Sequence, residues 1–295
     1  MSDKKTVIAL GYFDSVHKGH RKVVKLAKER AEKLGANLVV YTFDGDLKSI
    51  IGSSHEGFIY NTSERLCALK EAGADNVFFA PITKEFLSLN KKEFLDLIND
   101  EYDIVCYVTG TDYRFGFKAE GTTDYINEYA KQKGQESVFI DLEMLGEEKI
   151  STTRIKQALR RGDIELANKM LVRPYSISGE VYRDRQVGAT IGFPTVNVKI
   201  ENGKFAIKEG VYKGSIDILG EQYKTVINYG ARPTFDNANR CVEAHIIGYN
   251  GNLYDKKITL FFDKFIREIK KFEDKNALVE QLKADVKCVK DGKYD

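Results

Sequence analysis

The 295-residue chain has almost no excess of charge of either sign. Its 46 lysines and arginines nearly balance 44 aspartates and glutamates, for a formal net charge of +2. Nucleic-acid and membrane-surface proteins rely on a strong basic excess, so this balance argues against both and confines any phosphate binding to local sites. The sequence does not decide between a monomer and a homo-oligomer.

Long apolar runs and paired cysteines are missing as well. The apolar run at 6–10 is too short for a signal-peptide core, and no stretch approaches the length of a membrane span. The four cysteines are far apart and form no CxxC pair, which favours isolated thiols over a disulfide or metal site. We therefore expect a cytoplasmic protein.

In the first half of the chain, apolar runs alternate with stretches of helical spacing. Strands are expected at 6–10, 37–43, 76–80, 104–108 and 137–140, and helices at 17–34, 63–72, 91–99 and 123–133. Such alternation favours parallel strands with helices on both faces, so this half is predicted to be a doubly wound α/β domain. Ligands of such domains bind beyond the carboxyl ends of the strands.

The pattern changes after about residue 172. Short strands separated by Gly, Asn and Asp turns are expected at 175–182, 195–200, 211–219, 223–228, 241–247 and 257–265. Regular short strands indicate a small β-barrel or a sandwich, and 275–290 returns to helical spacing. We therefore expect two domains, residues 1–172 and 173–295, with a helical stretch at 153–171 before the boundary.

The sharpest local motif is GYFDSVHKGH at 11–20, directly after the first strand. His17 and His20 are three residues apart, so at a helix start they share one face. A helix N-terminus offers free N–H groups and a positive dipole end, and Gly11 and Gly19 allow a ligand close to the backbone. Two imidazoles there can stabilise phosphate charge during nucleotidyl transfer. Two solvated surface histidines are the alternative interpretation.

A second candidate phosphate site is the segment ISTTRIK at 150–156. Its hydroxyl side chains can cap a helix and donate hydrogen bonds to an anion at the helix start; these are Ser151, Thr152 and Thr153. Taken alone, such a segment is more often only a helix N-cap that binds no ligand.

In the second half, GFPTVN at 192–197 is the most informative motif. Gly192 permits a close approach and Pro194 fixes the backbone, while Thr195 and Asn197 alternate to one face of the strand that follows. Their oxygens are hard ligands, suited to Mg²⁺ that bridges ATP phosphates. A glycine–proline turn entering an ordinary strand is the alternative.

The motifs of the first half resemble a known superfamily. A strand followed by HxGH resembles the nucleotidyltransferases, and GYFDSVHKGH resembles their flavin-forming branch; GTDYRFG at 110–116 resembles the flavin and nucleotide loop of that branch. The resemblance implies that His17 and His20 stabilise the α-phosphate transition state. It also implies that the substrates are held by Gly11, Phe13, Asp14, Gly19, Asp112, Arg114, Phe115, Ser151, Thr152, Thr153 and Lys156.

The second half resembles riboflavin kinase. The resemblance covers residues 179–197, INYGARPTF at 227–235, VEAHI at 242–246 and the closing stretch 266–285. It implies that Glu243 is the general base for the ribityl hydroxyl that attacks the γ-phosphoryl group of ATP. Strand alternation places Glu243 and His245 on one face. The resemblance further implies Mg²⁺ ligands at Thr195 and Asn197, and flavin or nucleotide contacts at Gly192, Phe193, Pro194 and Arg267.

Nearly the whole chain, about residues 6–285, thus resembles the bacterial bifunctional riboflavin kinase/FAD synthetase family. The family implies a cytoplasmic enzyme that uses ATP and Mg²⁺ to convert riboflavin to FMN and FMN to FAD. Its fold would be a doubly wound nucleotidyltransferase domain followed by a small β-barrel kinase domain with a terminal helix.

The first half departs from this family at two places. TFDGDL at 42–47 stands where a Pro-His-Pro-like turn is expected, and Lys156 stands where the family has an arginine, whose bidentate fork lysine lacks. Asp44 and Asp46 could hold Mg²⁺ or lie in a solvated turn. Two alternatives follow: a riboflavin kinase whose first half is inactive or uses another nucleotide, and a non-catalytic flavin sensor.

Overall fold

The chain forms two compact units, Met1–Thr152 and Thr153–Asp295. The computed structural model describes residues 4–45, 56–183, 187–201, 203–231 and 240–292. Asp46, a candidate Mg²⁺ ligand, lies outside the described residues, as do parts of the segments 42–47, 179–197 and 227–235. Within the described ranges, no helix is both long enough and apolar enough to cross a membrane.

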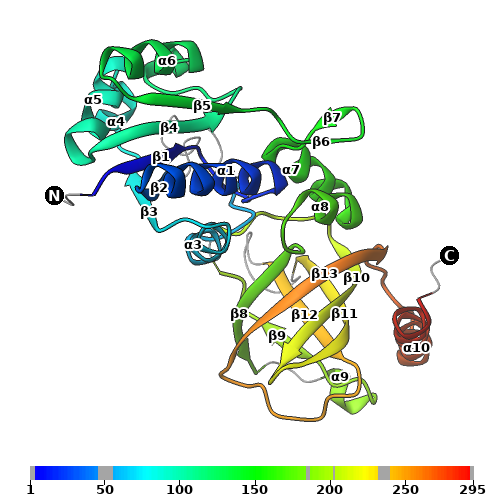
Figure 1. Cartoon of the computed structure of the whole chain (residues 1–295). Coiled ribbons are helices and arrows are strands. Elements are labelled where there is room, and N and C mark those ends of the chain that lie inside the picture. Colours follow the sequence, from blue (N-terminus) through cyan, green and yellow to red (C-terminus); the bar gives the residue numbers. More distant parts are fainter. Residues whose placement is uncertain (1–3, 46–55, 184–186, 202, 232–239, 293–295) are drawn as a thin grey trace. The chain divides into compact units, whose positions relative to one another are not determined.

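The first unit is built on a five-stranded parallel sheet in the order β3-β2-β1-β4-β5 (Figure 1). Its strands are β1 Thr6–Leu10, β2 Asn37–Asp44, β3 Asn76–Pro81, β4 Ile104–Gly110 and β5 Glu136–Ile140. The chain runs from β1 outward to β3 and returns past β1 to β4, so the strand order reverses between β1 and β4. The predicted doubly wound fold is confirmed, and its ligand crevice belongs at this reversal.

Helices cover both faces of the sheet, with α1 on one face and α5 and α6 on the other (Figure 1). The first unit contains α1 Lys18–Leu34, α3 Thr62–Glu71, α4 Lys84–Ser88, α5 Lys91–Glu101, the 3₁₀ turn η1 Phe117–Ala119, α6 Thr123–Gln132 and a hairpin of β6 Met144–Leu145 and β7 Glu148–Lys149. β1 is buried at every position, as expected of a central parallel strand. The short α4, η1 and hairpin have too few residues to show a periodic pattern, so the sequence did not predict them.

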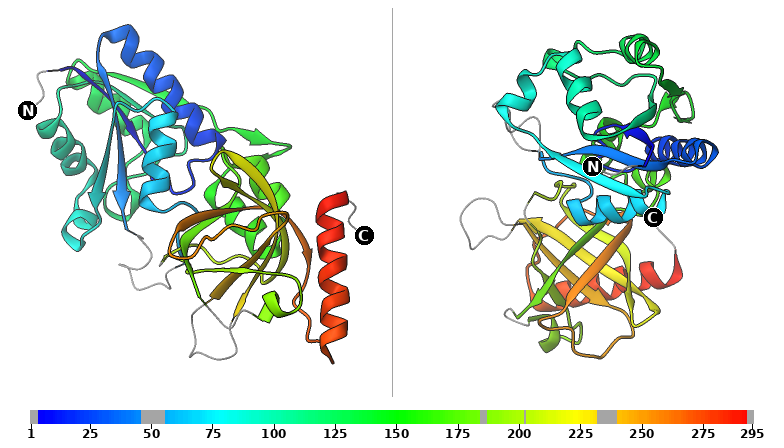
Figure 2. Two further views of the ribbon diagram at one scale, coloured as in Figure 1. Left: turned by 90° about the horizontal axis from the view of Figure 1, so that it is seen from below. Right: turned by 60° about the vertical axis from the view of Figure 1, so that its left-hand side comes forward.

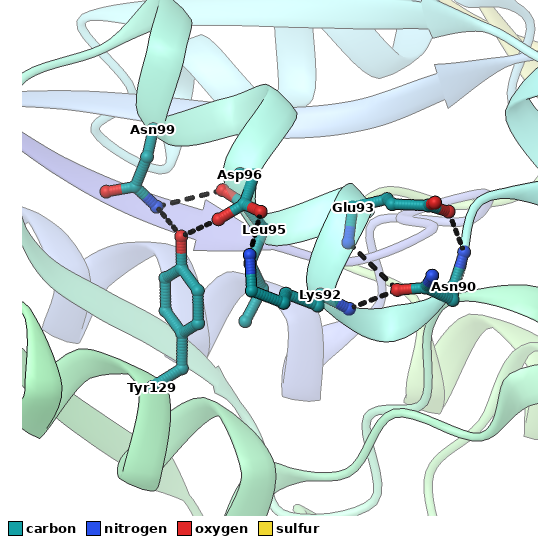
Figure 3. Close-up of polar contacts among 7 residues, drawn as sticks. All are labelled: Asn90, Lys92, Glu93, Leu95, Asp96, Asn99 and Tyr129. Atoms are coloured by element: carbon teal, nitrogen blue, oxygen red, sulfur yellow. Dashed lines mark hydrogen bonds and ion pairs between the residues drawn. The ribbon is translucent and has the colours of Figure 1, made fainter.

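Side-chain hydrogen bonds set the start of α5 and join it to its neighbours (Figure 3). The Asn90 side chain accepts the N–H of Glu93 and the Glu93 carboxylate accepts the N–H of Asn90, which completes a capping box. Asn99 donates to the hydroxyls of Tyr107 on β4 and Tyr129 on α6. These bonds hold both helices against β4, the strand that leads into the GTDYRFG loop.

The second unit is a closed antiparallel barrel of six strands in the order β10-β11-β12-β9-β8-β13. Its strands are β8 Ser176–Tyr182, β9 Val196–Val198, β10 Gly210–Ile218, β11 Glu221–Ala231, β12 Arg240–Ile246 and β13 Lys257–Arg267, with a short α9 at Val187–Thr190. Closure decides between the barrel and the sandwich that the sequence left open, and it removes the exposed sheet edges. The terminal helix α10, Lys275–Asp291, lies beside the barrel (Figure 2).

The helical stretch expected at 153–171 consists of two helices, α7 Thr152–Arg161 and α8 Ile164–Met170. Gly162 separates them with φ 82°, a left-handed conformation that favours glycine. The Asp163 side chain then accepts the N–H of Leu166 and caps α8. The break is therefore a local effect of these residues, which helical spacing alone did not reveal.

Candidate active sites

One cavity lies at the strand-order reversal of the parallel sheet. The segments after β1, β4 and β5 line it, together with the first residue of α7. The predicted residues in this lining are Gly11, Phe13, His17, Gly19, His20, Asp112, Ser151 and Thr152. Segments far apart in the sequence thus meet where doubly wound sheets bind ligands.

His17 and His20 lie against each other at the start of α1. His17 is the N-cap residue, and its Nδ1 accepts the N–H of His20 at 3.1 Å. The two rings are stacked, with centroids 3.6 Å apart and planes 14° apart. Because Nδ1 of His17 accepts, the proton of the neutral ring is on Nε2, which can donate to a ligand.

Both imidazoles are held neutral. Burial lowers the pKa of His17 to about 4, against smaller raising effects of a backbone hydrogen bond and Asp112. Burial, and then the charges of His17 and Arg65, lower the pKa of His20 well below its ordinary value. Nδ1 of His20 is buried and has no hydrogen-bond partner in the part of the chain that the structure describes. The pair therefore offers uncharged hydrogen-bonding groups rather than two positive charges.

Phe13 shapes the wall behind His20. Its φ of 45° is in the left-handed region, which a bulky residue seldom occupies. Its ring contacts the His20 ring edge-on, with centroids 5.0 Å apart. A Cβ at Gly11 would lie 2.7 Å from the Phe13 ring, so a larger residue at Gly11 would push this ring toward His20 or out of place.

Asp112 and the hydroxyl residues Ser151 and Thr152 also line this cavity. The Asp112 carboxylate pairs with the Lys149 ammonium at 3.0 Å. The Thr152 hydroxyl lies 3.1 Å from the Ser15 hydroxyl, which ties the start of α7 to the loop after β1. Ser151 also lines the cavity. The hydroxyls of Ser151 and Thr152 thus line the same cavity as the two histidines and are donors that a phosphate can use.

The remaining predicted residues of the first half lie outside this lining: Asp14, Arg114, Phe115, Thr153 and Lys156. Asp14 is buried and accepts the N–H of Ile59 at 3.1 Å, so it supports the loop from behind. Phe115 packs in the core of the sheet. The Lys156 ammonium lies over the Phe205 ring within the second unit, 5.3 Å from its centroid. Arg114 and Thr153, the other two of these predicted residues, are exposed.

Arg65 of α3 is a further residue of this region, and no motif marked it. Its side chain is 1% exposed, and its guanidinium donates to the carbonyls of Tyr12 (2.8 Å) and Phe13 (3.2 Å). It shares the buried face of its helix with Ala68 and Leu69. An arginine at this spacing within an apolar helix face is the sequence signal that would have identified it.

A second cavity lies in the other unit, between the barrel and α10. Predicted residues in its lining are Phe193, Thr195, Glu243 and Arg267. Much of the rest is apolar, including Leu278 and Leu282 of α10 and Val211 and Val226 of the barrel. An apolar cavity with a few polar groups on one side suits a flat, largely apolar ring with a polar chain attached.

Glu243 and Thr195 are directly hydrogen-bonded. The Thr195 hydroxyl donates to a Glu243 carboxylate oxygen at 2.6 Å. Glu243 and His245 both line the cavity, on the face of β12 that strand alternation predicts. Since its O–H hydrogen is directed to Glu243, the oxygen lone pairs of Thr195 remain available to a cation.

Asn197 lies opposite Glu243 in the pairing of β9 with β12. It is buried, and its side-chain oxygen accepts the thiol of Cys241 at 3.7 Å. Within the described residues, no group of three His, Cys, Asp or Glu side chains is placed to hold a metal. Neutral oxygens of Thr195 and Asn197 nevertheless fit Mg²⁺, which keeps few protein ligands and takes others from phosphates.

The GFPTVN turn is fastened to the barrel through His245. The ring Nδ1–H of His245 donates to the carbonyl of Pro194 at 2.8 Å, and the Phe193 ring contacts the His245 ring edge-on. Gly192 has φ 84°, which favours glycine. Three predicted residues lie outside the lining of the second cavity: Gly192, Pro194 and Asn197. His245 therefore orients the turn that carries Thr195.

Arg267 forms an ion pair at the second cavity. Its guanidinium forms two hydrogen bonds with the Asp285 carboxylate of α10, at 2.9 and 2.6 Å. Asp285 is 2% exposed and also accepts from Gln281. A bidentate, buried pair of this kind positions α10 as one wall of the cavity.

Comparisons with known proteins match both halves of the chain. Residues 1–154 match the family model of FAD synthetases, and residues 171–292 match that of riboflavin kinases. A bifunctional riboflavin kinase/FMN adenylyltransferase of Bacillus subtilis is 33% identical over 95% of this chain and 90% of its own length. The protein of the same name from Listeria monocytogenes is 30% identical over 96% and 91%.

A solved structure has the same architecture over nearly the whole length. It is that of a protein described as a macrolide-efflux protein from Streptococcus pneumoniae, with a TM-score of 0.91. It is 29% identical to this chain, and the match covers 98% of this chain and 95% of the other. The likeness therefore extends over both units.

Proposed function

This chain belongs to the family of bifunctional riboflavin kinase/FMN adenylyltransferases, and from this premise we propose that it makes flavin cofactors in two steps. The second cavity transfers the γ-phosphoryl group of ATP to riboflavin and releases FMN and ADP. The first cavity joins FMN to the AMP part of ATP and releases FAD and pyrophosphate. The observation that carries the kinase step is the Thr195–Glu243 hydrogen bond inside a mainly apolar cavity.

In the kinase step, Glu243 accepts the proton of the attacking ribityl hydroxyl. The Thr195 hydroxyl holds one carboxylate oxygen, which leaves the other for the substrate. Mg²⁺, held by Thr195, Asn197 and ATP phosphates, would neutralise charge on the transferred group. Val211, Val226, Leu278 and Leu282 supply the apolar surface that excludes water from the flavin ring.

In the adenylyl-transfer step, the protein supplies position and hydrogen bonds but no nucleophile, because the FMN phosphate itself attacks. His17 and His20, as neutral groups at the start of α1, donate to the α-phosphate as its charge develops. The substrates are held by three further residues of the same lining, Asp112, Ser151 and Thr152. Three predicted residues lie outside the cavity and would contact the substrates only if substrate binding moved them there: Arg114, Thr153 and Lys156.

The two catalytic halves are proposed to be residues 1–172 and 173–295, as the sequence pattern suggested. The matched family segments end at 154 and begin at 171, and the compact units divide after Thr152. We also propose a cytoplasmic location, supported by four cysteines that are all free thiols. The absence of nucleic-acid and membrane partners stays a prediction, and a homo-oligomer stays as open as a monomer.

The test is to incubate the purified protein with riboflavin, ATP and Mg²⁺ and to separate the products by chromatography. FMN followed by FAD is the expected result. FMN without FAD would leave a riboflavin kinase and make Lys156 and the replaced 42–47 segment the suspects for a silent first half. Bound flavin with no conversion would refute the enzyme and favour a flavin sensor.

A further inference from the structure

Arg65 is a buried cation that spans two segments of the first unit. Its guanidinium donates to the Tyr12 and Phe13 carbonyls in the loop after β1. It also donates to the Phe43 carbonyl (3.0 Å) and the Thr42 hydroxyl (2.7 Å) at the end of β2. One side chain therefore holds the loop that carries the histidine motif against the neighbouring strand.

The arrangement requires an arginine rather than any cation. The planar guanidinium directs its N–H groups along fixed, separate lines, and its four hydrogen bonds to these segments use Nε and both terminal nitrogens. The Phe79 ring, 5.1 Å away, covers the group and adds a cation–π contact. A lysine would carry the charge but could not reach all of these acceptors from a single nitrogen.

The loop that Arg65 holds has a conformation that needs support. Phe13 and Val16 have φ angles of 45° and 38°, both left-handed and unfavourable for their side chains. The Phe13 carbonyl accepts from Arg65, while the Phe13 ring contacts the His20 ring edge-on. His20 in turn stacks on His17. A direct chain of contacts thus runs from the Arg65 guanidinium to both imidazoles.

We propose that Arg65 is a positioning residue for adenylyl transfer: by fixing the Tyr12–Phe13 backbone, it sets the Phe13 ring and hence His20 and His17 at the cavity. The proposal rests on the adenylyl-transfer activity proposed for the first cavity. Arg65 itself does not line this cavity and acts through Phe13. Its positive charge also opposes protonation of His20.

The test compares Arg65→Lys and Arg65→Met with the wild-type chain. Because correct placement of catalytic groups governs the chemical step, both variants should lower kcat for FAD formation by about 10- to 100-fold, with KM for ATP changed by less than about threefold. FMN formation should stay unchanged because it uses the other cavity. Arg30→Met, which removes an arginine paired with Glu136 in the same unit, is the control and should leave both activities unchanged.

Imidazole NMR gives a readout that does not depend on turnover. The chain contains four histidines, so His17 and His20 resonances can be assigned from single variants. Arg65→Met should raise the pKa of His20, because it removes a positive charge that lowers this pKa; the other titratable group acting on His20 is His17, whose own pKa Asp112 raises. Arg65→Lys should keep this pKa low yet shift the resonances of both rings, because it retains the charge and loses the geometry.

Two results would overturn the proposal. Full FAD formation by Arg65→Lys would show that the fork geometry is unnecessary, even if Arg65→Met failed to fold. Lost FAD formation with unchanged His17 and His20 resonances would show that Arg65 does not act through these rings. If instead the wild-type chain formed no FAD, the proposed adenylyl transfer would fail, whereas the imidazole resonances would still decide whether Arg65 positions the pair.

Discussion

At the scale of single residues, His17 has a structural task beside the chemical one that we propose for it. Its Nδ1 caps α1, and this leaves its Nε2–H to face a ligand. Protonating Nδ1 would break the cap and would place a positive charge in a buried stack with His20. The same hydrogen bond thus sets the tautomer, the ring orientation and the neutral state.

His17 makes the stability of the first unit depend on pH. Its pKa is about 4 in the folded chain and near 6.5 when unfolded, so between these values the unfolded state binds more protons. We therefore expect stability to be retained above pH 6.5 and to fall by about 3 kcal/mol from this residue as the pH decreases to 4. Thermal unfolding of the ligand-free protein between pH 4 and 7.5 would measure this.

The matched variant for this pH effect is His17→Asn. The asparagine side chain can still cap α1, but it does not titrate in this range. Its unfolding temperature should depend less on pH than that of the wild-type chain. Parallel curves for the two proteins would contradict the assignment of the effect to His17.

At the scale of elements, α10 is attached to the barrel by one buried charge pair. Arg267 of β13 and Asp285 of α10 are joined by two hydrogen bonds, with side-chain exposures of 15% and 2%. The apolar contacts of Val289 with Val211 and Val226 lie nearby on the same helix face. The pair therefore fixes a helix that forms one wall of the second cavity.

Asp285→Asn should weaken this attachment strongly. Removing one partner leaves the Arg267 charge largely buried and unpaired, which costs on the order of 3–5 kcal/mol. We expect a lower unfolding temperature of the second unit and a raised KM for riboflavin, measured by calorimetry and by FMN formation. Glu280→Gln breaks the exposed Glu280–Lys283 pair of the same helix and should change neither, because exposed pairs contribute little. Equal effects of the two variants would contradict this account.

At the scale of the whole molecule, the two cavities use separate groups for their chemistry. His17 and His20 line only the first, and Glu243 lines only the second. In the proposed function, FMN is the product of the second cavity and the substrate of the first. Each activity should therefore be removable without the other when FMN is supplied.

Reciprocal variants test this independence. His17→Asn keeps the helix cap and removes the imidazole, so FAD formation from FMN should fall by about 100-fold while FMN formation persists. Glu243→Gln removes the base, so FMN formation should fall by at least about 100-fold while FAD formation from added FMN persists. Both reactions are followed by chromatography of the flavins. Loss of both activities in either variant would argue against two separate sites.

The sequence by itself determined the local features of this protein. Periodicity located the five parallel strands and the main helices, because side-chain spacing of 2 or 3.6 residues is a property of short segments. The motifs around His17, Ser151 and Thr195 were recognisable for the same reason. Each is a contiguous run whose residues act together, and the structure places their key side chains in the two cavities.

Only the tertiary structure decided what depends on distant pairs. It closed the barrel, joined Thr195 to Glu243 across 48 positions, and put Arg65 behind the Phe13 loop. It also showed that Asp14 and Phe115 lie outside the first cavity and support the fold, whereas other residues of the same motifs line that cavity. A residue's burial and partners follow from packing between segments, and no single segment contains that information.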